Sequence, residues 1–442
     1  MTRIPIFFSL LLVLATPAVP QNKLSPQKHR SGATALSTYK LLAVKVSGSD
    51  RYQPEAIAAA SGLVIGQSVN EENFKEATQK LGATGLFTDI AYNYSFSPAG
   101  TKLELQIREN KQLIPVRFDN FPWYSDQELI DKVRTTVPLF QGQVPVGGGL
   151  VDEIADVIDA LLAQRNPQFH VKYLRAAESE DGGPILDVVF SVTGAQFRIR
   201  NVEFTGANSS RLPALTAASR RLKDADYLRS GLAMFAKFDA QPIYQKQGFL
   251  KATFEQAQAQ VVSETADETV VDVTLPVIEG QQYRFQAVEW TGNSIFTADK
   301  LQPLIHAQAN EPMNGIQLDQ DLEAVRRLYG TRGYMKAKVL PEPRFNDGES
   351  TVAYTMEIKE GDQYKMGDLD FDGVDEKTVA RLREDWKLRE GEPYDASYPL
   401  RFFKEASSDL PRTSGWNVAV HESLNDKDKT VDVALRYTAK EH

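Results

Sequence analysis

Cysteine is absent from this chain of 442 residues, and histidine is scarce. Without cysteine the protein has no disulfide, no thiolate metal ligand, no thiol nucleophile and no attachment site for a lipoprotein anchor. The histidines show no i, i+4 pair or other spacing typical of metal ligands; they are His29, His170, His306, His421 and His442. The chain also lacks a phosphate-binding glycine loop, a nucleophile elbow and a zincin motif. We therefore expect no metal site, no cofactor and no enzymatic activity.

An excess of positive charge is also missing. The sequence contains 50 Lys and Arg against 59 Asp and Glu, and it has no long basic run. Nucleic acids and anionic lipid surfaces attract proteins with basic patches, so we expect neither as a partner. Beyond the first residues, no apolar run approaches the roughly 20 residues that a transmembrane helix requires. Any membrane association should therefore be indirect, through a partner.

The first residues have the pattern of an export signal. Arg3 precedes an apolar stretch of 12 residues, from Ile4 to Ala15, and small side chains follow it. We predict a signal peptide over residues 1–18, cleaved after Ala18. The alternative is a signal anchor that stays in the membrane, for which 12 apolar residues are few. Residues 19–38 are polar and rich in Ser, Pro, Gln and Lys, which indicates a flexible leader.

A short pattern of alternating apolar residues that ends on a turn recurs in the rest of the chain. The occurrences are VKVSG ending at Gly48, VRFDN at Asn120, VEFTG at Gly206, VEWTG at Gly292 and LDFDG at Gly373. Successive turns lie 72, 86, 86 and 81 residues apart. A recurring interval of this size is typical of a series of small similar domains, so the function should belong to the array and not to a single pocket.

The fourth repeat shows the order of the elements most clearly. RFQAVEWTG alternates as a strand up to Gly292, and Thr297 is placed to cap a first helix from about Ala298 to Ala307. A second helix ends at Gly333 and carries apolar side chains on one face, namely Leu318, Leu322, Val325 and Leu328. YMKAKVLP and TVAYTMEIKEG then alternate as two strands. The order is strand, helix, helix, strand, strand.

The other repeats follow the same order. We predict an α+β fold, a tandem array of five βααββ domains, each a three-stranded sheet covered by two helices. The predicted domains are residues 39–110, 111–193, 194–280, 281–361 and 362–442. The second is the least typical, because it has Asn120 at the turn and a GQVPVGGG insertion that we interpret as a mobile loop. Acidic pairs such as Asp319 with Asp321 are expected to be solvated.

Glycine and an aromatic residue mark the joint between the second helix and the second strand. A glycine directly precedes the aromatic residue in three repeats, at Gly248, Gly333 and Gly415. A helix that passes into a strand without a long loop needs a left-handed residue, which glycine adopts at the least cost. The aromatic side chain should then fill the end of the interface between helix and sheet.

These residues resemble the POTRA (polypeptide-transport-associated) domain. The resemblance rests on ATGLFTDI at 83–90, RGYMKAKV at 332–339 and the EGxxYR and EGxxYK junctions, and it extends over about residues 39–438. Five such units after a signal peptide resemble the periplasmic arm of the BamA group of outer-membrane protein assembly factors. Members of that group carry a membrane barrel after the last unit, whereas this chain stops at His442. The resemblance therefore implies a periplasmic protein, peripheral to the outer membrane, that acts with a separate barrel.

A small open sheet should leave its second strand at an edge, where an extended peptide can add as a further strand. The candidate binding residues on these strands are Phe87, Ile90, Tyr92, Phe249, Ala252, Phe254, Tyr334, Ala337, Val339, Trp416, Val418 and Val420. The alternative for the fourth repeat is a protected edge, because Lys336 and Lys338 alternate outward. Phe249, Tyr334 and Trp416 are also interpreted as residues that fill the core.

Three functions remain open at this point. The first is a scaffold or chaperone-like module that binds outer-membrane protein clients, or the barrel and accessory subunits of an assembly complex, by strand addition. The second is a purely structural adaptor for a separate barrel or a cell-division complex. The third, an extracytoplasmic enzyme, would require a ligand in a concave site between units.

Overall fold

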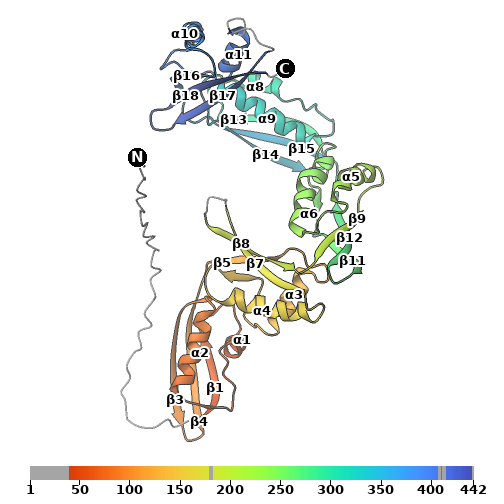
Figure 1. Ribbon diagram of the computed structural model, residues 1–442, viewed down its shortest axis with the longest axis vertical. Helices are drawn as coiled ribbons and strands as arrows, with labels where there is room; N and C mark the ends of the chain where they lie inside the picture. Colours follow the sequence, from red (N-terminus) through yellow and green to blue (C-terminus); the bar gives the residue numbers. More distant parts are fainter. Residues whose placement is uncertain (1–38, 179–182, 407–409, 411–414, 441–442) are drawn as a thin grey trace, which may run out of the picture.

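The computed structural model describes residues 39–178, 183–406, 410 and 415–440. The predicted signal peptide and leader lie outside the described residues. The described part of the chain forms five sheets. In Figure 1 these follow one another in sequence order along the long axis of an elongated, curved molecule. We name the segments that contain them the first to fifth units: residues 39–109, 113–193, 196–278, 284–359 and 365–439.

The first two units contain the same sequence of elements. The first consists of β1 (Tyr39–Ser47), α1 (Pro54–Ala60), β2 (Ser68–Val69), α2 (Glu71–Ala83), β3 (Phe87–Ser97) and β4 (Gly100–Glu109). The second consists of β5 (Leu113–Phe118), α3 (Asp126–Arg134), β6 (Gln143–Pro145), α4 (Leu150–Ala163), β7 (His170–Ala177) and β8 (Ile185–Thr193).

The other three units keep the order with local changes. The third has β9 (Gln196–Thr205), α5 (Leu212–Ser219), the 3-10 helix η1 (Arg220–Leu222), α6 (Arg229–Phe235), the π-helix η2 (Ala236–Ala240), α7 (Gln241–Gln245), β10 (Thr253–Phe254), β11 (Gln258–Glu264) and β12 (Glu268–Ile278). The fourth has β13 (Arg284–Thr291), α8 (Ala298–Leu301), the 3-10 helix η3 (Gln302–Leu304), α9 (Gly315–Gly330), β14 (Lys338–Asn346) and β15 (Thr351–Lys359). The fifth has β16 (Lys365–Asp372), α10 (Glu376–Asp385), α11 (Tyr398–Glu405), β17 (Trp416–Asn425) and β18 (Thr430–Ala439).

Every sheet has the same strand arrangement. The last strand of the unit lies in the centre, the first strand pairs with it in parallel, and the second long strand pairs with it antiparallel on the other side. In the fourth unit, for example, Val288 of β13 and Val339 of β14 pair with Tyr354 and Ile358 of β15. The result is a mixed α+β fold in which helices pack against the sheets.

A short extended segment between the helices was not predicted. It forms β2 and β6 in the first two units and single bridges to the first strand, at Asp226, Pro312 and Pro393, in the others. Each segment contributes one apolar side chain that is at most 1% exposed; these are Val69, Val144, Tyr227, Met313 and Tyr394. The segment therefore anchors the connection between the helices in the core and pairs with the start of the first strand.

The repeated turn residue has a direct structural cause. Gly48, Gly206, Gly292 and Gly373 all have positive φ, and a Cβ on any of them would overlap the carbonyl oxygen of a residue near the end of the central strand. Asn120 takes this place in the second unit. Its side chain donates to the Val192 oxygen at 2.9 Å and accepts from the Val192 nitrogen at 2.6 Å. A side-chain amide, which is both donor and acceptor, here makes the contact with the central strand.

Three local predictions were wrong. The helix expected to run to Ala307 ends at Leu301, because Pro303 lacks the N–H group that a helix interior needs. Thr297 precedes α8, but its side chain makes no capping hydrogen bond. Asp321 is 2% exposed instead of solvated. It accepts hydrogen bonds from the His306 backbone and ring, which ties the loop after η3 to α9.

The glycines at 147–149 are docked and do not form a free loop. The Gly149 nitrogen donates to the Ala83 oxygen of the first unit at 2.8 Å. A Cβ on Gly148 would lie 2.7 Å from the Thr84 oxygen, so only a residue without a side chain permits this approach. The insertion that we interpreted as mobile is thus part of the contact between the first and second units.

Buried apolar side chains form several clusters. One runs from Leu41 of the first unit to Val273 of the third, so the first three units share continuous packing. A second cluster lies between the helices of the third unit and the end of its central strand β12. The fourth and fifth units each have one cluster of their own. Leu250 and Met335, which follow the joint glycines, pack against the cluster of the next unit.

Candidate functional site

The second long strand of each unit has a strand neighbour on one side only. β3, β7, β11, β14 and β17 each pair with the central strand of their sheet and with no other strand among the described residues. The backbone N–H and C=O groups along the other side of such a strand are available to an added strand. The topology therefore agrees with the expected position of the second strand.

The predicted binding residues fall into two groups. Phe87, Ile90 and Tyr92 lie in β3, and Trp416, Val418 and Val420 lie in β17, as expected. Phe254 and Val339 lie near the starts of their strands, in β10 and β14. Phe249, Ala252, Tyr334 and Ala337 precede the strands. For these four residues the prediction of an edge strand was wrong.

The strands begin late because the chain first closes the end of the preceding helix. The Phe249 nitrogen donates to the Tyr244 oxygen at 3.1 Å, and the Tyr334 nitrogen donates to the Tyr329 oxygen at 3.2 Å. These bonds reach back five residues, as in a glycine-terminated helix. Gly248 has φ +86 and Gly333 has φ +83, which confirms the predicted left-handed joint.

The aromatic side chains at these joints face inward. The Phe249 ring lies edge-on to Tyr244, and the Arg211 guanidinium lies 3.9 Å from its centroid. The Tyr334 ring lies edge-on to Tyr329. Both are partly buried against the cores of their units, so their side chains pack the core.

Two prolines distinguish β14 from the other edges. Pro341 and Pro343 pair with Met356 and Tyr354, and the register of β14 against β15 is continuous from Lys338 to Asn346. Since proline has no N–H group, an unbroken ladder requires that the missing donors belong to the open side. The open edge of β14 thus lacks two donors that an added strand would need. β3, β7, β10, β11 and β17 contain no proline.

Lys336 does not guard the edge of β14. It lies before the strand and pairs with Asp426 of the fifth unit, which also accepts a hydrogen bond from Tyr364. The hydrogen bonds from Lys336 and Tyr364 hold the pKa of Asp426 below its usual value. Of the two lysines that were expected to protect this edge, only Lys338 lies on β14, where it is exposed.

The joint between the third and fourth units has the same construction. Lys251 donates to Asp347 at 2.7 Å, and Tyr283 donates to the same oxygen at 2.6 Å. The Tyr283 nitrogen donates to the Gly248 oxygen at 2.8 Å, and in the next joint Tyr364 and Gly333 make the same bond at 2.7 Å. The tyrosine of the EGxxYR and EGxxYK junctions therefore connects the third unit to the fourth and the fourth unit to the fifth.

The joint between the second and third units is built differently. Arg229, whose side chain is 12% exposed, pairs with Asp126 and donates to the backbone oxygens of Phe118, Phe121 and Tyr124. A buried guanidinium with this many acceptors fixes the segment before α3 against the start of α6. The sequence pattern did not indicate this joint, because Arg229 is far from its partners along the chain.

A pocket lies where this joint meets the edge of the third sheet. It has a volume of about 390 Å³ and is lined by residues 122–125 and Glu128 of the second unit and by Arg229 and residues 255–259 of the third. Residues 255–257 separate β10 from β11. The pocket therefore adjoins an interruption in the edge strand.

Trp123 forms one wall of this pocket and is held in place by the third unit. Its indole nitrogen donates to Glu264 at 2.7 Å, and the same carboxylate accepts from Arg165 at 3.0 Å. The Arg165 guanidinium also lies 4.7 Å from the centre of the Trp123 ring. These contacts link the two units at the far end of β11.

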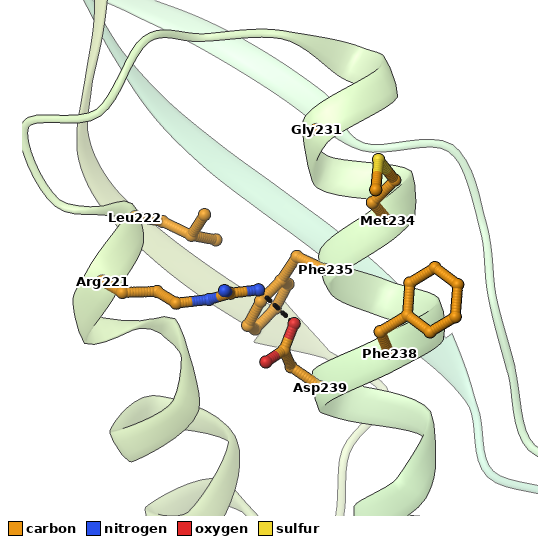
Figure 2. A pocket seen from close by; sticks show the side chains of 7 residues that line it. All are labelled: Arg221, Leu222, Gly231, Met234, Phe235, Phe238 and Asp239. Atoms are coloured by element: carbon orange, nitrogen blue, oxygen red, sulfur yellow. Dashed lines mark hydrogen bonds and ion pairs between the residues drawn. The ribbon is translucent and has the colours of Figure 1, made fainter. Parts of the chain in front are cut away.

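A second concave surface lies on the helical layer of the third unit (Figure 2). Met234 and Phe238, one helical turn apart, are 62% and 63% exposed, and Arg221 pairs with Asp239 beside them. The π-helix η2 lies beside this surface. Pro242 has no N–H group for the Phe238 oxygen, the Gln241 nitrogen donates to the Ala236 oxygen, and the extra residue turns Ala240 inward.

The fold and its edges define a modular protein of small α+β units in series. Residues 283–361 match the POTRA family model, described as a surface antigen variable number repeat. A Treponema pallidum (strain Nichols) protein that is provisionally named an outer membrane protein assembly factor is 23% identical over 255 residues, which cover 54% of this chain and 30% of that protein. Outer membrane protein assembly factor BamA of Buchnera aphidicola subsp. Acyrthosiphon pisum (strain APS) is 25% identical over 177 residues, which cover 40% of this chain and 28% of that protein.

Among solved structures, POTRA domains 3–5 of Haemophilus influenzae BamA match with 22% identity and a TM-score of 0.40, over 56% of this chain and 96% of that one. The family match assigns residues 283–361 to the POTRA domain, and the chain resembles the BamA-type outer-membrane assembly factors. The matches span less than a third of the length of the two curated relatives.

Two further findings concern the described residues alone. None of the helices in the described ranges is long and apolar enough to cross a membrane. No cluster of three or more His, Asp or Glu side chains suited to a metal ion occurs among the residues that the structure describes.

Proposed function

We propose that this chain is a non-enzymatic, exported scaffold of five POTRA-like domains, with the boundaries given above, that acts in outer-membrane protein assembly. It binds extended clients or partner subunits by adding them as a strand to the open edge of a sheet. The similarity to assembly factors supports the process, and the open edges support the mode of binding. A periplasmic location, peripheral to the outer membrane, follows from the same proposal.

The edge of β10 and β11 is the observation that carries the proposal. It has a strand neighbour on one side only among the described residues, contains no proline and adjoins a pocket. β3 and β17 are further candidates, and with them the predicted residues Phe87 to Tyr92 and Trp416 to Val420. β14 is disfavoured because Pro341 and Pro343 remove two donors.

The fourth sheet shows how to test this edge without breaking the ladder. Equivalent positions of the third and fourth sheets can be found by counting back from the glutamate of the EGxxYR and EGxxYK junctions. Pro343 pairs with Tyr354, which lies six residues before Glu360. Ala259 pairs with Val273, which likewise lies six residues before Glu279, so Ala259 and Pro343 are equivalent. Ala259→Pro therefore places proline where the fourth sheet tolerates it. It should remove an outward N–H group and keep the pairing with β12.

The experiment measures binding of a synthetic extended peptide, with alternating Thr and Val, to the full chain by chemical-shift changes and calorimetry. Ala259→Pro should abolish binding at the third unit, whereas Ala259→Val, which keeps the N–H group, should retain it. Equal binding by both variants would place the site elsewhere. If no peptide binds to the unaltered chain even at high concentration, strand addition is refuted.

A structural adaptor is the second candidate function, and the joints favour it. The contacts of Lys251 with Asp347, Lys336 with Asp426 and Arg229 with Asp126 each bridge two units. An adaptor of this kind would hold the spacing and angle of a partner complex without contacting clients. It predicts that the peptide titration is negative while a separate barrel or accessory subunit still copurifies with the chain.

A further inference from the structure

The pocket beside β11 lies on the face of the third sheet that packs against the core. Ala257 and Ala259 line it and are also packed against the buried clusters of the sheet. In a strand added to this edge, every second side chain would point to the same face as Ala259. One such side chain would therefore enter the pocket.

The walls of the pocket suit a large apolar side chain. Pro122, Trp123 and Tyr124 supply the wall from the second unit, and Ala257 and Ala259 supply small side chains opposite. A volume of about 390 Å³ is at the lower end of the range for small-molecule pockets. It is large enough for one aromatic ring of an added strand.

The charges at the pocket are acidic. Glu255 is exposed and has no ion-pair partner among the described residues, and Glu128 is bound to Ser125. The guanidinium of Arg229 is already paired with Asp126 and bound to backbone oxygens. A basic side chain two positions from the aromatic one, on the same face of the added strand, would therefore meet an uncompensated carboxylate at the interruption of the edge.

We propose that this pocket is a side-chain subsite for the strand that adds to β11, and that it selects an extended segment with an aromatic residue and, two positions along, a lysine or arginine. The inference rests on the proposed function, because the subsite is reached only by a strand at this edge. It also requires the joint between the second and third units, since each supplies a wall.

The test uses the full chain and synthetic peptides of alternating Thr and Val that differ only at two central positions, which lie two residues apart and so share one face of the strand. These positions carry Phe and Lys, Ala and Lys, or Phe and Glu, and the peptides are named Phe-Lys, Ala-Lys and Phe-Glu. The Phe-Lys peptide should bind about tenfold more tightly than the Ala-Lys peptide, because a phenyl ring is removed from water. It should also bind more tightly than the Phe-Glu peptide, and added salt should reduce this second difference.

Two variants assign the preference to the pocket. Ala257→Leu fills the pocket outside the paired strands and should remove the preference for Phe over Ala. Glu255→Lys should reverse the preference for Lys over Glu, whereas Glu342→Lys, an exposed position on β14, should leave it unchanged. A circular dichroism melt of each variant shows that the fold is retained.

The outcomes separate the subsite from strand addition itself. If all three peptides bind equally and Ala259→Pro abolishes their binding, strand addition stands and the subsite is refuted. If preference for Phe-Lys persists in both Ala257→Leu and Glu255→Lys, selection occurs elsewhere and the subsite is also refuted. If none of the peptides binds, the proposed function fails together with the subsite.

Discussion

Replacing Gly333 by alanine should weaken the joint between the fourth and fifth units far more than the same change at Gly391. Both glycines have a left-handed backbone, with φ +83 and φ +82. A Cβ on Gly333 would overlap the Tyr364 oxygen and approach the Tyr394 nitrogen at 3.2 Å. A Cβ on Gly391 would meet no atom within 4 Å. The pair therefore separates the backbone cost from the cost of close approach.

The magnitudes follow from these two terms. An alanine held in the left-handed region costs roughly 1–2 kcal/mol, and this is the whole expected cost at Gly391. Gly333→Ala has the same backbone cost. In addition, its Cβ must displace the backbone of Tyr364, whose nitrogen donates a 2.7 Å hydrogen bond to the Gly333 oxygen. Overpacking in a closely packed region adds about 1–3 kcal/mol. The expected difference between the two variants is about 2 kcal/mol.

Native-state hydrogen exchange on the full chain is the suitable assay, because units that open separately do not share one free energy of unfolding. A difference of about 2 kcal/mol corresponds to roughly 30-fold faster exchange at the amides around Tyr364 and Tyr394 in Gly333→Ala than in Gly391→Ala. Amides in the first unit serve as the internal reference. If the two variants exchange equally at the joint, the argument from close approach is wrong.

Two further predictions concern other contacts between distant residues. Asn120→Ala leaves the paired N–H and C=O groups of Val192 without their side-chain partner and should cost about 2 kcal/mol, seen as faster exchange in the second sheet; Asn120→Asp should recover only part of this, and no loss in either would contradict the assigned role. The contact of Asp426 with Lys336 and Tyr364 lowers the pKa of Asp426 and raises the pKa of both partners. Its stabilisation should be fully present above pH ~4, be lost as the pH falls through the lowered pKa, and persist on the alkaline side to above pH ~10. X-ray scattering on the full chain should show a change of shape in acid that Asp426→Asn already shows at neutral pH; if Asp426→Asn and the unaltered chain give the same profile at neutral pH, the assigned role is wrong.

Much of each unit could be predicted from the sequence, because the determining requirements are local. The turn at Gly292 and the joint at Gly333 need a left-handed residue, and glycine marks both positions in the chain. The alternation of β15 follows from one buried face of the sheet. The short segments between the helices also left a signal in four of the five units, a buried apolar residue next to an aspartate or asparagine, but so few paired residues form no periodic pattern.

The candidate site was predicted only in part. The second strand was correctly expected at an edge, but its start was placed too early in the third and fourth units, because the residue after the joint glycine still bonds to the helix. Pro341 and Pro343 lay in the printed sequence, yet their meaning depends on which side of β14 is open. The pocket beside β11 could not be predicted, since its walls come from residues about 130 positions apart, such as Trp123 and Ala257.

The sequence by itself determined the repeat, the order of elements within a unit and the glycines at turns and joints, since these depend on backbone conformation and on periodic burial within short segments. Only the tertiary structure decided which edges are open, how Asn120 replaces a glycine, and why the glycines at 147–149 are docked. It also decided that Lys336 belongs to a joint and not to an edge. The physical reason is the same in each case: these roles are set by the approach of residues that are far apart in the chain, and a pattern along the chain does not record such contacts.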